Sequence, residues 1–148
     1  MTHIYAHPGT YSPSVTVTDA LGGKNATRLA PITIFAPLTA LIQASSTTPV
    51  AGQSAGLKAV ATGGSGNYSC SWDFGDANTA SSCVVAHSWA TSGNYTVTLT
   101  VRDSQGNKVI ATMYVNVQNQ QSSVAQGTIA GVPFYDLAAI GIIAVIAV

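Results

Sequence analysis

The chain has 148 residues, enough for one domain of ordinary size plus a smaller unit, and its 47% hydrophobic content can supply a core. Only 7% of the residues are charged, with five basic and five acidic residues and no glutamate. Five basic residues are too few to form the cluster of positive charge that nucleic-acid binding needs. The scarcity of Glu, Lys and Arg, which favour helices, also argues against a helical protein. We therefore expect an all-β protein that works outside the cytoplasm and does not bind nucleic acid.

The beginning of the chain recurs 84 residues later. Residues 3–22 align without gaps on residues 87–106, and below we call positions offset by 84 equivalent. We interpret residues 1–37 as the C-terminal half of one repeat and residues 38–118 as a complete repeat. The coincident pairs are His3/His87, Gly9/Gly93, Tyr11/Tyr95, Val17/Val101, Asp19/Asp103 and Gly22/Gly106.

Alternating apolar and polar residues predict strands throughout the complete repeat. About seven short strands separated by turns predict a sandwich of two sheets. Residues 3–36 carry two or three strands with open edges, so either the missing strands were cut off or another chain supplies them. Pro13 stands where Val97 does and cannot donate to a ladder, which suits an edge strand and slightly favours the cut. The clearest predicted elements are strands at 57–62, 68–74, 83–87, 95–101 and 109–117 and turns at 63–66 and 103–106.

Cys70 and Cys83 are the only cysteines. An even count at short spacing predicts one disulfide in an oxidising compartment, which would stabilise the fold by about 3 kcal/mol. Two free buried thiols are the alternative, and a zinc site is disfavoured because two thiols and the nearby His87 fall short of four ligands. Three N-x-[ST] triplets, at Asn25, Asn67 and Asn94, are candidate glycosylation sites on an exported chain, although such triplets also arise by chance in a Thr-rich sequence.

The complete repeat carries a motif made of Trp72, Asp73, Phe74, Gly75, Asp76, His87, Gly93, Tyr95, Asp103 and Gly106. This motif resembles that of the polycystic-kidney-disease (PKD) domain family. The resemblance covers about residues 40–118 in full and residues 3–36 as a half domain. It implies an immunoglobulin-like β-sandwich without catalytic activity or cofactor, which is extracellular, often in tandem and, in archaeal and bacterial surface proteins, near a C-terminal anchor. Two positions depart from the family pattern: Ala77 replaces a usual Gly and Trp89 a usual Tyr.

The suggestive side chains also have structural interpretations. Trp72 and Phe74 alternate beside a cysteine, which favours core packing over a sugar-stacking platform. Tyr95 fits a tyrosine corner, whose hydroxyl bonds to nearby backbone. Asp73 and Asp76 are weak Ca²⁺ candidates, because two carboxylates are too few for its six to eight oxygens and turn-stabilising bonds are the more common role.

Catalytic patterns in the sequence lack their required context. Residues 52–56 match the G-x-S-x-G nucleophile motif but precede a strand rather than a helix, and residues 73–75 match the kinase D-F-G triplet without its companion motifs. His3, His7 and His87 are interpreted as structural, since His3 and His87 are equivalent. We expect no enzyme activity.

The C-terminal part of the chain predicts a stalk and an anchor. Residues 119–128 are rich in Gln and Ser, and residues 129–148 form an apolar segment that ends in twelve uninterrupted apolar residues. Twelve helical residues span about 18 Å, less than the roughly 30 Å of a bilayer core. We therefore expect a truncated transmembrane helix, with Asp136 at the membrane interface.

Three functions are compatible with this organisation. The leading one is a non-catalytic adhesion or spacer module of a glycosylated, membrane-anchored cell-surface protein, with protein or polysaccharide partners. The second is the substrate-binding accessory module of a secreted hydrolase, which exposed aromatics on one sheet would favour and a buried Trp72 would weaken. The third is a subunit of a surface filament or lattice, in which another chain supplies the strands missing from residues 3–36.

Overall fold

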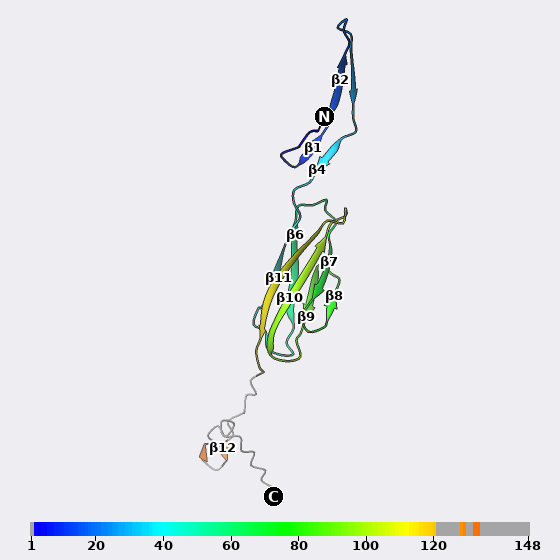
Figure 1. Ribbon diagram of the computed structural model, residues 1–148. Coiled ribbons are helices and arrows are strands. Elements are labelled where there is room, and N and C mark those ends of the chain that lie inside the picture. Colours follow the sequence, from blue (N-terminus) through cyan, green and yellow to red (C-terminus); the bar gives the residue numbers. More distant parts are fainter. Residues whose placement is uncertain (1, 121–127, 130–131, 134–148) are drawn as a thin grey trace.

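The computed structural model describes residues 2–120, 128–129 and 132–133 (Figure 1). Every regular element in these residues is a β-strand, and none of them belongs to a helix long and apolar enough to cross a membrane. The strands are β1 (Gly9–Tyr11), β2 (Ser14–Thr18), β3 (Lys24–Arg28), β4 (Ile32–Ile34), β5 (Thr39–Ala44), β6 (Ala55–Thr62), β7 (Ser69–Asp73), β8 (Thr79–Ala80), β9 (Val84–His87), β10 (Gly93–Arg102), β11 (Lys108–Val117), β12 (Thr128–Ile129) and β13 (Val132–Pro133).

Strands β5 to β11 form a sandwich of two antiparallel sheets. One sheet has the order β11-β10-β7-β8 and the other the order β5-β6-β9. The all-β sandwich of two sheets expected from the sequence is therefore confirmed. The structure adds two strands that the sequence pattern did not single out, β5 and the two-residue β8 inside the predicted polar loop.

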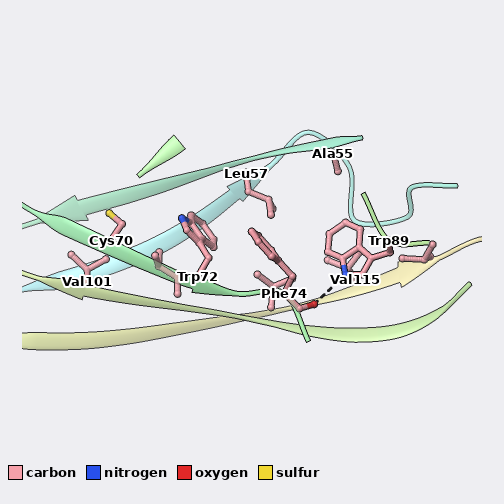
Figure 2. Packing of buried hydrophobic residues seen from close by; sticks show 11 residues of the cluster. Ala55, Leu57, Cys70, Trp72, Phe74, Trp89, Val101 and Val115 are labelled. Atoms are coloured by element: carbon pink, nitrogen blue, oxygen red, sulfur yellow. Dashed lines mark hydrogen bonds between the residues drawn. The ribbon is translucent and has the colours of Figure 1, made fainter. Parts of the chain in front are cut away.

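The core lies between the two sheets and is built by alternation along the strands. On β10, Val97, Leu99 and Val101 are fully buried, whereas the threonines between them lie on the outer face. Trp72 and Phe74 enter the same core from β7 and the loop after it (Figure 2). The buried core residues are Ala55, Leu57, Cys70, Trp72, Phe74, Trp89, Val97, Leu99, Val101, Val115 and Val117.

The segment 47–51 links the two sheets. After β5 the chain crosses to the other sheet, where Val50 forms a parallel bridge with Gln118. Backbone hydrogen bonds of 2.8–2.9 Å tie Thr47, Pro49 and Ala51 to the end of β11 and to Gln118. The segment covers part of the β11 edge, which leaves fewer backbone groups open for pairing with other chains.

Residues 9–34, here called the N-terminal unit, form two short antiparallel ladders beyond one end of the sandwich (Figure 1). Strand β2 pairs with β3 and β1 pairs with β4, so the unit has four strands rather than the expected two or three. The pairing register shifts by one residue between the ladders, from Ser14↔Arg28 to Tyr11↔Ile32. Pro13 lies at this shift, and it has no N–H with which to continue a ladder.

The predicted apolar helix falls almost entirely outside the described residues. Of the segment 129–148, the structure describes only Ile129, Val132 and Pro133, and these belong to the paired strands β12 and β13.

Candidate functional site

The loop that follows β7 carries the acidic residues of the family motif. Asp73 Oδ1 accepts a hydrogen bond from the Gly75 backbone N–H at 2.9 Å, and Asp76 Oδ1 accepts one from the Asn78 N–H at 3.2 Å. Gly75 has φ +77°, and a Cβ added there would lie 2.8 Å from the Thr96 carbonyl oxygen. Both carboxylates thus hold turns, and the glycine is needed for close backbone approach.

Ala77 lies in the same loop, at the position where the family usually has glycine. Its φ is +69°, in the left-handed region that L-residues other than Gly rarely adopt. The tight turn is therefore kept, and the alanine adopts the backbone conformation that glycine favours, at a steric cost of about 1–2 kcal/mol.

Asp76 and His87 form a side-chain hydrogen bond that the sequence pattern did not reveal. Asp76 Oδ2 and His87 Nε2 are 2.8 Å apart, and both side chains are mostly buried. The His87 ring stacks on Phe74 with a centroid separation of 4.0 Å. Burial raises the pKa of Asp76, but hydrogen bonds from Asn78 and His87 outweigh it, so the pKa lies below its ordinary value.

Both tryptophans are buried and hydrogen-bonded. Trp72 and Trp89 are each 1% exposed. The Trp72 indole N–H donates to the Ser82 carbonyl at 2.7 Å, and the Trp89 indole N–H donates to the Phe74 carbonyl at 3.1 Å (Figure 2). Their rings fix the loops on either side of the core, and neither can serve as a sugar-stacking platform.

Two equivalent tyrosines make the same local hydrogen bond. The Tyr95 hydroxyl donates to the Thr91 carbonyl at 3.0 Å, and the Tyr11 hydroxyl donates to the His7 carbonyl at 2.8 Å. Tyr95 therefore has the geometry of a tyrosine corner, and Tyr11 reproduces it 84 residues earlier. His3 is exposed and packs edge-on against Tyr5.

Asp103 organises the loops at the end of the sandwich that faces the N-terminal unit. Its carboxylate accepts hydrogen bonds from the Asn107 side chain and from the backbone N–H groups of Ser65, Gln105 and Asn107, at 2.9–3.0 Å. The Asn107 side chain contributes most to lowering the pKa of Asp103 to about 2, against burial of the carboxylate. Gly106 closes the predicted turn by donating its N–H to the Asp103 carbonyl.

A disulfide joins Cys70 on β7 to Cys83 just before β9, as predicted. Because β7 and β9 belong to different sheets, the bond ties the two layers together. A pocket of about 280 Å³ lies beside the disulfide. It is lined by Lys58, Ala59, Val60, Ala61, Tyr68, Cys70 and Cys83.

The three candidate glycosylation residues are all exposed. Asn25 lies on β3, Asn67 lies in the turn before β7 with φ +49°, and Asn94 lies on β10. Asn94 Oδ1 accepts a hydrogen bond from the Asn116 side chain.

Within the described part of the chain, no group of three or more His, Cys, Asp or Glu side chains is placed to hold a metal ion. Asp73 and Asp76, even with His87 beside Asp76, therefore do not form such a group. The G-x-S-x-G match at 52–56 is a turn that leads into β6, and its Gly52 N–H donates to the Trp89 carbonyl at 2.8 Å. It has no helix to position a nucleophile.

Two surface features were not predicted. A cavity of about 460 Å³ lies between residues 33–38 and the loops at Gly64 and 105–108. On the outer face of the four-stranded sheet, Tyr114 is 79% exposed and lies opposite Thr96. Neither feature has a local sequence signal. The cavity depends on how the N-terminal unit meets the sandwich, and the exposure of Tyr114 depends on which face of β11 points outward.

The model of the PKD domain family matches residues 36–117. No curated protein matches the chain. A solved structure of carbohydrate-binding modules from the β-sandwich superfamily, with promiscuous specificity, is similar at 26% identity and TM-score 0.53; the match covers 55% of this chain and 34% of that one. The chain thus spans about a third of that structure's length.

Two solved bacterial domains are also similar. The first PKD domain of Vibrio anguillarum Epp is 25% identical with TM-score 0.49, covering 56% of this chain and 95% of that domain. The first PKD domain of the Vibrio cholerae metalloprotease PrtV is 29% identical with TM-score 0.47, covering 53% and 94%. Because the family model matches more than half of the chain, the chain belongs to the PKD domain family.

Proposed function

We propose that the chain is a non-catalytic spacer and interaction module of an extracellular, membrane-anchored surface protein. The observation that carries the spacer role is that the chain enters and leaves the sandwich at opposite ends. Strands β5 and β11 both begin beside the cavity that contacts the N-terminal unit. From there β11 runs ten residues to Val117, a rise of about 33 Å, before the stalk begins.

Stretching single molecules tests the spacer role. A sandwich that carries load in series should resist and then unfold in one discrete step. The disulfide closes a loop with a sequence separation of 13 and a Cα–Cα distance of 5.0 Å, so reduction should lengthen that step by about 40 Å. Gradual extension at low force, without a step, would contradict a load-bearing spacer.

The anchoring part of the proposal rests on the sequence of residues 129–148, with residues 119–128 as the stalk. The full chain should stay with membranes after alkaline extraction, and a chain that ends at residue 127 should be released. Release of both chains would refute the anchor.

Glycosylation is tested separately by expressing the chain in an exporting host. Glycans on Asn25, Asn67 or Asn94 would appear as mass increments that each Asn→Gln change removes, and a chain without such increments would refute the use of these sites.

Glycan binding is a second candidate, favoured by Tyr114 and by the similarity to carbohydrate-binding modules. The exposed Tyr114 ring stands among outward threonines, so stacking and hydroxyl hydrogen bonds are both available to an uncharged sugar chain. The buried Trp72 and Trp89 weaken the case for a broad aromatic platform of the kind that a hydrolase accessory module would use.

Affinity electrophoresis through neutral polysaccharides tests this candidate. Tyr114→Ala should abolish any retardation, whereas Ile110→Ala, on the same face of β11, should leave it in place. Equal retardation of the two variants would remove Tyr114 from the site, and no retardation of the native chain would remove this candidate for the polysaccharides tested.

A further inference from the structure

The N-terminal unit exposes an apolar face that its equivalent in the sandwich buries. Val15 and Val17 on β2 are 52% and 64% exposed. Their equivalents on β10, Leu99 and Val101, are both 0% exposed. Exposed valines side by side on a strand are a candidate interaction surface.

The hairpin that carries this face already has the shape of its buried equivalent. The β2–β3 pairs Thr16↔Ala26 and Val17↔Asn25 are the same, shifted by 84, as the β10–β11 pairs Thr100↔Ile110 and Val101↔Val109. At the turn, the Asp19 carboxylate accepts the N–H groups of Leu21 and Gly23, as Asp103 accepts those of Gln105 and Asn107.

The sandwich shows what covers such a face. Strand β7 pairs with the other edge of β10, placing Trp72 opposite Leu99 and Cys70 opposite Val101. The β5-β6-β9 sheet then lies over both strands and adds Leu57 and Ala55 to the core. In the described residues β2 pairs with β3 alone, so its other edge is open.

The lack of charge on this face is consistent with a partner that resembles the covering strands of the sandwich. The exposed valines carry no charge, and the residues that cover their equivalents (Leu57, Cys70 and Trp72) are also uncharged. A second copy of this chain already uses its own β5–β9 to cover its own β10 and β11. The partner must therefore be an additional segment with the pattern of β5–β9.

We propose that the β2–β3 hairpin is an acceptor site for the front half of another PKD-type repeat. In this complex the partner's equivalent of β7 lies antiparallel to β2, with a large aromatic side chain opposite Val15 and a small apolar one opposite Val17. This inference rests on the proposed spacer function, because the complex would extend the spacer into a series of sandwiches. It does not depend on the anchor or on glycan binding.

The offset of 84 supplies the experiment. Since Ala86 precedes His87, a copy of residues 38–86 placed directly before His3 in the full chain would rebuild a complete repeat without a linker. Hydrogen exchange of the amides in 14–18 should then slow by at least about a hundredfold, because their opening becomes coupled to unfolding of a sandwich. The matched control is the same fusion with Val17→Asp. In this control the amides in 14–18 should still exchange rapidly, while the amides in 98–102 stay protected from exchange.

A peptide with the sequence of residues 66–80, with Cys70→Ser, provides a second arm in trans. Added to the full chain, it should slow exchange in 14–18 of the native sequence and not of the Val17→Asp variant. Unchanged exchange in 14–18 in both arms, with 98–102 protected, would overturn the proposal. The force and membrane experiments would be unaffected, so failure here is distinguishable from failure of the spacer or anchor.

Discussion

Strands β2 and β10 have equivalent sequences and very different environments. Each alternates apolar residues with threonines or serine, and each leads into a turn held by an aspartate carboxylate. Yet Val17 is 64% exposed and Val101 is fully buried. The hairpin is therefore set by local sequence, whereas burial depends on strands that come from elsewhere in the chain.

The two aspartates show the same division. Asp19 bonds only within its own turn, to the N–H groups of Leu21 and Gly23. Asp103 adds the Ser65 N–H, which belongs to the loop between β6 and β7, and the Asn107 side chain. A turn residue thus becomes a tertiary contact once a second loop lies against it.

Removal of the disulfide should have the largest effect, and only on the sandwich. Changing both cysteines to alanine should lower the free energy of unfolding by about 3 kcal/mol, because it frees a loop of about fourteen residues in the unfolded state. Urea titration followed by tryptophan fluorescence measures this, since both tryptophans lie in the sandwich core. A change below about 1 kcal/mol would mean that the two sheets are held together without the bond.

The same valine substitution should differ between the two strands. Val101→Ala leaves a cavity in the core and should cost about 2 kcal/mol of unfolding free energy. Val17→Ala, at the equivalent exposed position, should change it by less than about 0.5 kcal/mol. Equal effects in the urea titration would contradict the difference in burial.

Acid should destabilise the sandwich through protonation of Asp103. The folded-state pKa of Asp103 is about 2, below the unfolded value of about 3.9, so its contribution is present above pH 4 and lost as pH falls toward 2. Asp103→Asn should therefore reduce the fall in the free energy of unfolding between pH 4 and 2. The smaller fall that remains would be due to Asp76. Asp19→Asn should leave the tryptophan-monitored transition unchanged; an equal reduction would refute the assignment.

The smallest expected effect is a gain of stability at Ala77. Ala77→Gly relieves a left-handed alanine but adds freedom to the unfolded chain, for a net gain of about 0.5 kcal/mol. Asn67→Gly is the matched control, because Asn tolerates its φ of +49° and should gain less. Thermal unfolding compares the two, and a loss at Ala77→Gly would show that the turn does not strain alanine.

Local patterns in the sequence were enough to predict much of the sandwich. Alternation from Tyr95 to Val101 predicted the core face of β10, and the spacing of the only two cysteines predicted the disulfide. The crossing segment 47–51 was not predicted, because its pairing with Gln118 depends on residues about 70 positions away and follows no periodicity.

The candidate site was less predictable than the fold. Asp76 and His87 were each interpreted singly, and their hydrogen bond depends on how the loop after β7 folds back on β9. The exposure of Tyr114 and the cavity beside Lys108 likewise depend on which surfaces meet in three dimensions.

Hydrogen exchange on the unmodified chain tests the central claim most directly, because it compares the amides in 14–18 with those in 98–102 in one sample. If burial by the opposite sheet makes the difference, the β10 amides should exchange only through unfolding of the sandwich and the β2 amides orders of magnitude faster. Equal protection of the two strands in the isolated chain would contradict the account, since β2 would then be stabilised without a covering sheet.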